Sequence, residues 1–119
     1  MKKTLIIGAS SNPERYSNRA AIQLMQQGHE VIQLGNKAGE VNGNLIYTSW
    51  PTMENIDTVS LYINPLIQKK YYDLLLLLHP KRIIFNPGTE NSELEELATS
   101  AGIHVLNACT LVLLSLKNY

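Results

Sequence analysis

The fold is decided by residues 4–17, which read TLIIGASSNPERYS. The first five, Thr4 to Gly8, are a mostly apolar run that ends at a glycine, a pattern typical of a central strand buried on both faces. After a polar loop, apolar residues recur at helical spacing from Ser17, which can cap the start of a helix that Gly28 can end. A strand, a loop and a helix in this order predict the first unit of an alternating α/β chain.

The same alternation continues along the chain. Further strands are predicted at residues 30–34, 58–63, 82–85 and 103–106, with a short extended piece at residues 45–47. Asn64 before a proline predicts one helix start, the pair Ser92 and Glu95 predicts a capping box, and residues 110–117 predict a closing helix. Residues 35–44 are predicted as a polar loop. The expected fold class is α/β: a three-layer Rossmann-like fold with a five-stranded, mainly parallel sheet.

Size and composition fit one soluble domain. The chain has 119 residues, of which 45% are hydrophobic and 17% are charged, and its ten basic residues balance ten acidic ones. That balance argues against a nucleic-acid or anionic membrane partner, and no apolar run is long enough to cross a bilayer. The one cysteine can form no internal disulfide and belongs to no zinc pattern. We expect a single domain over residues 1–119, in the cytoplasm.

The loop after the first predicted strand has the features of an anion site. In parallel sheets of this kind, ligands bind outside the carboxyl ends of the strands. Gly8 allows a tight turn and leaves room for a ligand, and Ser10, Ser11 and Asn12 supply hydroxyl, amide and backbone donors. The following helix points its N-terminal amides toward the same place, and Arg15 adds a forked donor suited to phosphate. An ordinary polar loop is the alternative, but the position after the first strand favours ligand binding.

The same region indicates which ligand the site would take. The dinucleotide fingerprint G-x-G-x-x-G is absent, because Ser10 and Pro13 occupy its later glycine positions. Lys37 follows the second predicted strand, where it would suit a phosphate on a ribose, and both NADP and coenzyme A (CoA) carry one. An exposed loop lysine is the alternative for Lys37, and Glu40 lies close enough in sequence to keep NAD as a weaker option.

The stretch from Ile6 to Ser17, with residues 28–32 after it, resembles the small stand-alone CoA-binding domain proteins. These are similar to the N-terminal CoA-binding domain of the succinyl-CoA synthetase α subunit, and the resemblance covers nearly the whole chain. It implies that residues 10–13 contact CoA, that Lys37 contacts a phosphate, and that residues 63–65 flank the cofactor. With the loop chemistry above, the predicted cofactor-binding residues are Gly8, Ser10, Ser11, Asn12, Pro13, Arg15, Tyr16, Lys37, Ile63, Asn64 and Pro65.

Two turns depart from the family pattern. The second predicted strand runs into residues 33–36, Gln-Leu-Gly-Asn, where the family has a Pro-Val-Asn-Pro-like turn. The fourth is followed by residues 86–89, Asn-Pro-Gly-Thr, in place of a Gln-Xaa-Gly-like turn. The phosphohistidine of the synthetase lies in a domain beyond the resemblance, so the resemblance does not imply synthetase activity.

Candidate catalytic groups are sparse. His29, His79 and His104 stand at no motif spacing from a serine, a cysteine or each other, and structural roles are favoured for all three. Cys109 follows the last predicted strand and faces either the ligand crevice or the core, with the core favoured. The predicted function is binding of CoA or an acyl-CoA at the carboxyl ends of the strands, without catalysis of its own. The alternatives are a small NADP-dependent oxidoreductase or other nucleotide-cofactor enzyme, and an interaction domain. A homodimer or a partner enzyme is left open.

Overall fold

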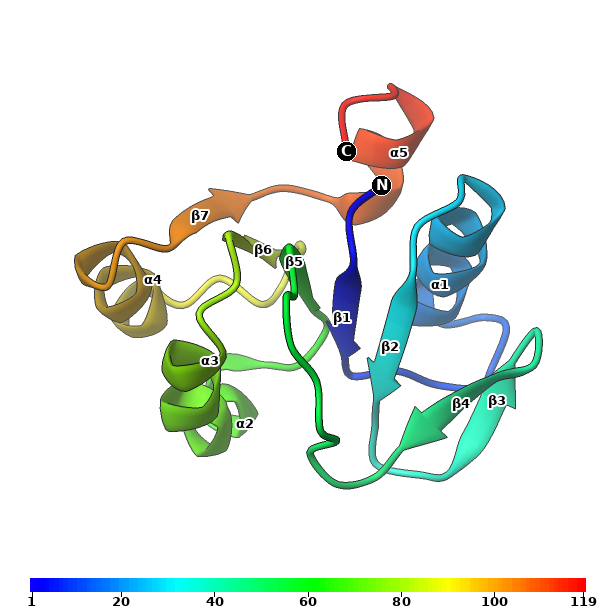
Figure 1. Cartoon of the computed structure of the whole chain (residues 1–119), viewed down its shortest axis with the longest axis horizontal. Coiled ribbons are helices and arrows are strands. Elements are labelled where there is room, and N and C mark those ends of the chain that lie inside the picture. The colour runs from blue at the N-terminus through cyan, green and yellow to red at the C-terminus, as the bar shows by residue number, and fades with distance from the viewer.

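Seven strands form one sheet in the computed structural model, which describes residues 1–119. Their order across the sheet is β3-β4-β2-β1-β5-β6-β7 (Figure 1). Neighbouring strands pair in parallel except β3 and β4, which pair antiparallel. The strands are β1 (Thr4–Ile7), β2 (Val31–Leu34), β3 (Gly39–Val41), β4 (Asn44–Tyr47), β5 (Thr58–Leu61), β6 (Arg82–Phe85) and β7 (His104–Asn107).

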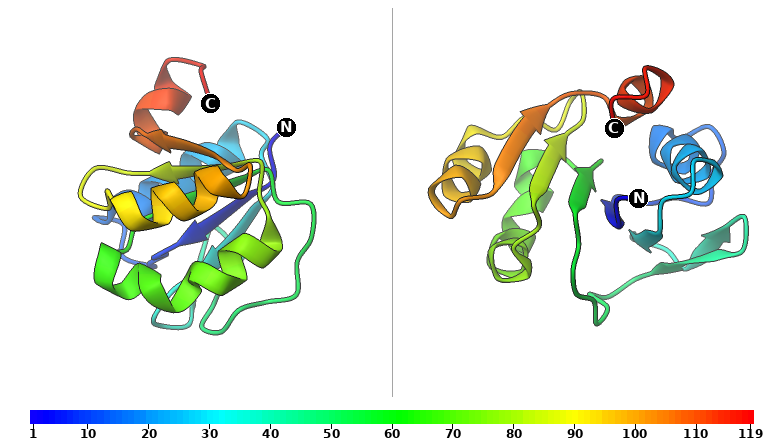
Figure 2. Two further views of the ribbon diagram at one scale, coloured as in Figure 1. Left: turned by 90° about the vertical axis from the view of Figure 1, so that its left-hand side faces the viewer. Right: turned by 45° about the horizontal axis from the view of Figure 1, so that its top comes forward.

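Helices cover both faces of this sheet (Figure 2). The helices α1 and α5 pack on one face, and α3 and α4 pack on the other. The helix predicted after Asn64 is two short helices joined by a 3₁₀ turn, Lys69–Tyr71. No helix is both long enough and apolar enough to span a bilayer. The helices are α1 (Tyr16–Gln26), α2 (Pro65–Gln68), α3 (Tyr72–Leu78), α4 (Ser92–Ser100) and α5 (Thr110–Ser115).

The core is divided between the two faces by the alternation of side chains along the strands. On β1, Leu5 and Ile7 pack toward α3 and α4, whereas Ile6 packs toward α1 and α5. Every residue of β1 and of β5 is buried, as expected for central parallel strands. Full burial of each such aliphatic side chain stabilises the fold by about 1.5–3 kcal/mol. The carboxyl ends of these strands are therefore a rigid base for the loops that follow them.

The predicted α/β class and the mainly parallel sheet are confirmed, but the prediction of five strands is wrong. Two further strands, β3 and β4, form a hairpin in the segment predicted mostly as a polar loop. Its two-residue turn is Asn42 and Gly43, with φ of +49° and +81°. An Asn-Gly pair is a strong sequence signal for such a turn, and the prediction overlooked it. The hairpin extends the sheet because β4 pairs in parallel with β2.

Two predicted helix caps are also wrong. Ser17 lies inside α1 and is buried, and the N-cap position belongs to Arg15, whose side chain makes no capping hydrogen bond. At α4 the cap is Asn91, whose side-chain oxygen accepts from two backbone amides, and not Ser92. The predicted cap at Asn64 is confirmed, since its side-chain oxygen accepts from the amide of Ile67 at 3.0 Å. In both wrong cases an extended residue upstream of the predicted cap begins the helix, two residues before Ser17 and one residue before Ser92.

Candidate functional site

A cavity of about 440 Å³ opens at the carboxyl ends of β1 and β2. Its wall combines the loop after β1, the loop after β2, and the first residue after β5. In a doubly wound sheet this is the position where ligands bind. The lining residues are Gly8, Ala9, Ser10, Ser11, Asn12, Arg15, Asn36, Lys37 and Tyr62.

Gly8 sets the course of the loop after β1. Its φ is +97°, in the left-handed half of backbone space that glycine adopts most readily. The amides of Gly8 and Ala9 both donate to the carbonyl oxygen of Leu34, at 2.9 and 3.0 Å, which ties the loop to the end of β2. On the other side, a Cβ atom at Gly8 would stand 2.8 Å from the carbonyl oxygen of Tyr62. The backbone is therefore fixed between β2 and the end of β5.

The loop holds its own shape through side-chain hydrogen bonds. The hydroxyl of Ser10 accepts from the amide of Asn12 at 3.1 Å, and the side-chain oxygen of Asn12 accepts from the amide of Glu14 at 3.0 Å. The buried side chain of Asn18 donates to the carbonyl oxygen of Ser10 at 2.9 Å. The amides of Ser10 and Ser11 make no hydrogen bond within the chain. A preformed loop with two unpaired amides can accept an anion without a large rearrangement.

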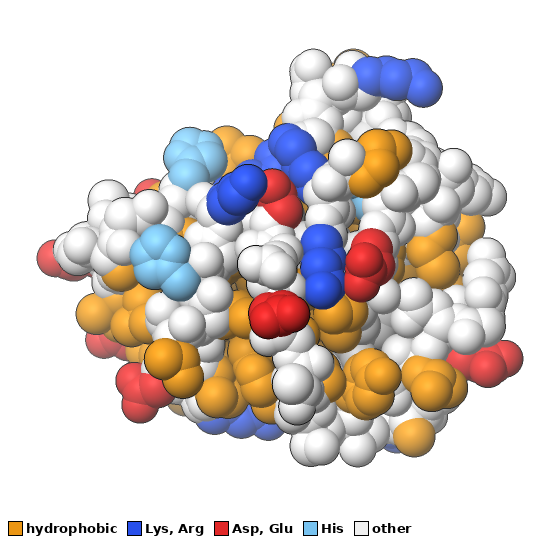
Figure 3. Space-filling view, viewed as in Figure 1, with side chains coloured by type: hydrophobic (Ala, Val, Ile, Leu, Met, Phe, Trp, Pro, Cys, Tyr) orange, Lys and Arg blue, Asp and Glu red, His pale blue; other side chains and the backbone are white.

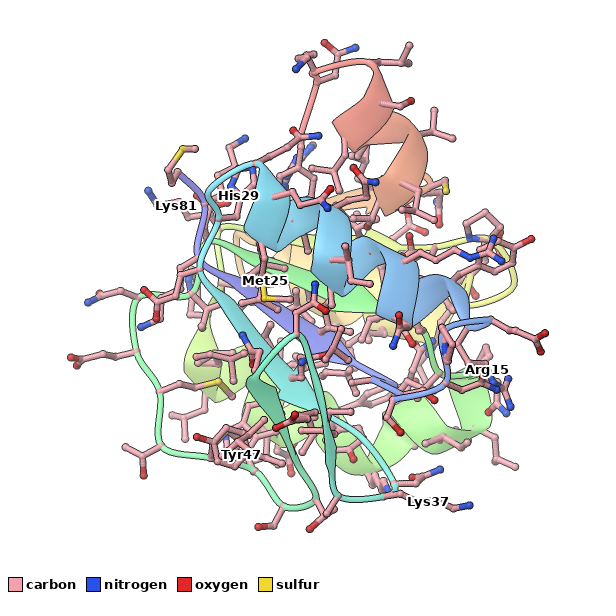
Figure 4. The ribbon with its side chains drawn as sticks, turned by 90° about the vertical axis from the view of Figure 1, so that its right-hand side faces the viewer. Arg15, Met25, His29, Lys37, Tyr47 and Lys81 are labelled. Atoms are coloured by element: carbon pink, nitrogen blue, oxygen red, sulfur yellow. The ribbon has the colours of Figure 1, made fainter.

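The charge around the cavity is positive. Arg15 and Lys37 line it, no acidic residue does, and neither cation forms an ion pair. Figure 4 shows both on the same side of the molecule. By contrast, the face viewed in Figure 3 carries Lys and Arg side chains beside Asp and Glu side chains, so charges of both signs are mixed there. The cavity is a local site of positive charge in a chain whose net charge is zero.

Tyr62 closes the side of the cavity that faces β5. Its hydroxyl is buried without a hydrogen-bond partner, and burial raises the pKa of Tyr62 to about 12. The nearby hydroxyls of Ser60 and Thr110 bond to each other at 2.8 Å and leave Tyr62 unpaired. Asn86 joins this group by donating to Ser60 at 2.9 Å and accepting from the amide of Thr110 at 2.8 Å. Cys109, the half-buried N-cap of α5, lies near the Tyr62 hydroxyl and does not line the cavity.

The structure brings six of the eleven predicted cofactor-binding residues to the cavity wall. These six are Gly8, Ser10, Ser11, Asn12, Arg15 and Lys37. The other five lie outside the lining: Pro13 is exposed in the loop, Tyr16 is the exposed first residue of α1, and Ile63, Asn64 and Pro65 lead into α2.

Sequence reasoning missed three lining residues, Ala9, Asn36 and Tyr62. Ala9 and Asn36 each stand beside a predicted site residue at a strand end. Tyr62 falls inside the strand predicted over residues 58–63, which in the structure ends at Leu61. A sharper strand boundary would have found it.

The histidines lie away from the cavity. The ring of His29 accepts from the amide of Lys2 at 2.9 Å, and its burial lowers the pKa of the imidazole. His79 ends α3 in the left-handed conformation, and its ring lies 2.9 Å from the carbonyl oxygen of Ala101. His104 is exposed on β7. No group of three His, Cys, Asp or Glu side chains is placed to hold a metal ion.

Residues 2–115 match the CoA binding domain family, and the chain belongs to it. The predicted family resemblance is therefore confirmed. A search of curated protein sequences gave no match.

Solved structures with the same fold span a wide range of identity. An uncharacterized protein shares 51% identity and a TM-score of 0.97, over 100% of this chain and 98% of that one. A hypothetical protein from Pyrococcus horikoshii OT3 shares 29% identity and a TM-score of 0.84, over 93% of this chain and 80% of that one. The dinucleotide forming acetyl-coenzyme A synthetase 1 from Ca. Korarchaeum cryptofilum shares 20% identity and a TM-score of 0.69, over 89% of this chain but 25% of that one. At that identity the likeness is one of fold.

Proposed function

We propose that the chain binds CoA or an acyl-CoA in the cavity at the carboxyl ends of β1 and β2, without catalysis of its own. One observation carries the proposal: two unpaired cations and two unpaired amides, from Arg15, Lys37, Ser10 and Ser11, line one preformed cavity. Such a donor set suits phosphate oxygens, because charge-assisted bonds from Arg and Lys and free backbone amides all favour anions. Membership of the CoA binding domain family supports CoA as the phosphate-bearing ligand.

The charge of the cavity favours CoA over NAD. An acidic residue at the end of the second strand is the usual partner of an unphosphorylated ribose, and no acid lines this cavity. Lys37 lines it instead and would pair with the 3′-phosphate of CoA. NADP carries a ribose phosphate too, and it remains the alternative ligand, of a small oxidoreductase. The cavity offers cations and amides that can bind an anion, and the three histidines of the chain lie away from it. We therefore propose that the chain is a carrier, a sensor or a partner of a larger enzyme, acting in the cytoplasm.

Calorimetry with four ligands tests this proposal. CoA, dephospho-CoA, NADP and NAD would be titrated into the full chain at the same ionic strength. We expect CoA to bind most tightly, dephospho-CoA more weakly because it lacks the 3′-phosphate, and NAD most weakly. Tighter binding of NADP than of CoA would favour the oxidoreductase, and tighter binding of NAD than of CoA would reject the assignment. A fifth titration uses acetyl-CoA, and equal affinity for acetyl-CoA and CoA would show that the thiol end is not recognised.

A further inference from the structure

β7 is an edge strand, and half of its backbone hydrogen-bonding groups face away from the sheet. The amides of His104 and Ala108 donate to carbonyl oxygens of Lys81 and Phe85 on the β6 side, at 3.1 and 3.2 Å. Alternate residues of a strand turn their backbone groups to opposite sides. The amides and carbonyls of Val105 and Asn107 therefore point to the open edge, where only another strand satisfies them in register.

The two edges of the sheet differ in how they are protected. The opposite edge strand, β3, has three residues, and they include Gly39 and the charged Glu40. A short strand with a charge is a common defence against edge-to-edge pairing. The sequence of β7 is His-Val-Leu-Asn, without a proline, lysine or acidic residue. Only the β7 edge is left open to a further strand.

The segment that runs from β7 through α5 is also free of charge. Residues 103–116 contain no Asp, Glu, Lys or Arg. In α5, which contacts α1, Val112 is 51% exposed, and Leu116 directly after the helix is 61% exposed. Helix α4, which contacts β7, exposes Leu97 and also carries three glutamates. A strand without charges is suited to meeting its own copy, because a twofold axis sets like residues close together.

We propose that two copies of this chain pair through antiparallel β7 strands about a twofold axis that passes beside Leu106. In this register Val105 and Asn107 of one copy exchange four backbone hydrogen bonds with Asn107 and Val105 of the other. The four outward groups of each strand, two amides and two carbonyls, are then satisfied. The two Leu106 residues stand opposite each other as a non-hydrogen-bonded pair, with Cα atoms about 4.5 Å apart.

Pairing of this kind stops at a dimer and leaves the cavity open. The free edges of the combined sheet are two copies of β3, which resist further pairing. In each copy β5 and β6 lie between β7 and the strand β1 that bears the cavity loop. The dimer therefore does not depend on the proposed CoA site, and either proposal can fail without the other.

Sedimentation velocity of the full chain, at concentrations up to about 1 mM, tests the dimer. We expect twice the chain mass for the natural sequence and the mass of one chain for Leu106→Lys, because two like charges directly opposite each other repel. The matched control, Leu45→Lys, places the same charge on an exposed residue of the internal strand β4 and should remain a dimer. A natural chain that stays monomeric, or a folded Leu106→Lys protein that stays dimeric, would overturn the proposal.

Cysteine cross-linking tests the register with variants that disturb packing less. In a Cys109→Ser background, Leu106→Cys places two thiols across the axis within disulfide reach, whereas His104→Cys faces Ala108 of the other copy. We expect mild oxidation to link the Leu106→Cys protein into a covalent dimer and to leave the His104→Cys protein unlinked. Equal linking at both positions, or none at Leu106→Cys, would refute the pairing.

Discussion

The carbonyl oxygen of Tyr62 lies 2.8 Å from the position that a Cβ atom on Gly8 would take. Gly8 also has a φ of +97°, where a side chain costs about 1–2 kcal/mol. Any residue other than glycine therefore meets two penalties, one from its own backbone and one from the end of β5. A substitution at Gly8 consequently tests folding before it tests binding.

We predict that Gly8→Ala lowers the free energy of unfolding by about 2–4 kcal/mol, since overpacking against a fixed backbone adds to the cost of the positive φ. Gly88→Ala is the matched control, because Gly88 has a φ of +92° and nothing within 4 Å of its Cβ position. There we expect about 1–2 kcal/mol. Urea unfolding of both variants gives the comparison, and equal losses would contradict the role of the contact with Tyr62.

The α/β class follows from the sequence because the strong signals are local. The buried run of β1 and the spacing of α1 are periodic patterns that burial alone explains. The β3 half of the hairpin has one apolar residue, Val41, so the pattern predicts a loop there although Asn42 and Gly43 mark the turn. The strand β4 pairs with β2, so that Gln33 lies opposite Ile46, a residue well separated from it in the sequence. The propensities of single residues do not reveal such a contact.

The candidate site was predictable in its first loop and less so elsewhere. The loop after β1 follows a clear strand end, and the donors named from the sequence do line the cavity. Residues 63–65 were assigned by resemblance, and in this chain they turn into α2, with Asn64 used as a helix cap. Tyr62 reaches the cavity because β5 ends at Leu61, two residues before the predicted end of the strand at Ile63. Strand boundaries shift by one or two residues too easily for sequence alone to place such a side chain.

At the start of α4, we predict that Asn91→Ala costs about 2–3 kcal/mol of stability. The side-chain oxygen of Asn91 accepts from the amides of Glu93 and Leu94, and its nitrogen donates to the buried Gln68 at 2.8 Å. Ser92→Ala is the control, because Ser92 is exposed and caps nothing, and we expect a change within about 0.5 kcal/mol. Thermal and urea unfolding would measure both. A larger loss for Ser92→Ala would restore the serine as the cap.

Lys37→Met should weaken the binding of CoA about tenfold and leave the affinity for dephospho-CoA unchanged. A charge-assisted bond is worth about 1.5–3 kcal/mol, and the lower value applies because Lys37 is exposed. Lys70→Met removes another exposed lysine, which lies over the ring of Tyr71 and outside the cavity, so it should leave both affinities unchanged. Calorimetry of the natural chain and both variants with the two ligands gives the six affinities needed. An equal loss of CoA and dephospho-CoA affinity in Lys37→Met would show that Lys37 does not contact the 3′-phosphate.

Stability should fall at high pH because of Tyr62. Burial raises its pKa to about 12 in the folded chain, against 10.0 for the free group. The folded state therefore holds the proton more tightly, and the stability this gives is complete below pH 10 and lost as the pH rises through about 12. The full effect is about 2–3 kcal/mol. Burial also raises the pKa of Tyr119, so the test compares two proteins and not two pH values alone.

Tyr62→Phe isolates this effect. The hydroxyl has no hydrogen-bond partner, so its removal should leave stability at pH 7 unchanged or slightly higher. Urea unfolding between pH 8 and 12 would then show a smaller decline for Tyr62→Phe than for the natural chain. Parallel declines would mean that the Tyr62 hydroxyl is solvated in solution.

Cys109 should be inert toward CoA in the native chain. It is half-buried at the N-cap of α5 and stands near the buried Tyr62 hydroxyl, outside the residues that line the cavity. A mixed disulfide forms only when a thiolate reaches a disulfide sulfur and displaces the other thiol. We therefore expect intact-mass analysis to find no CoA adduct after incubation with CoA disulfide under native conditions. In denaturant the exposed thiol should gain one CoA, and Cys109→Ser should gain none. A native adduct that Cys109→Ser abolishes would contradict this and place the thiol of bound CoA beside Cys109.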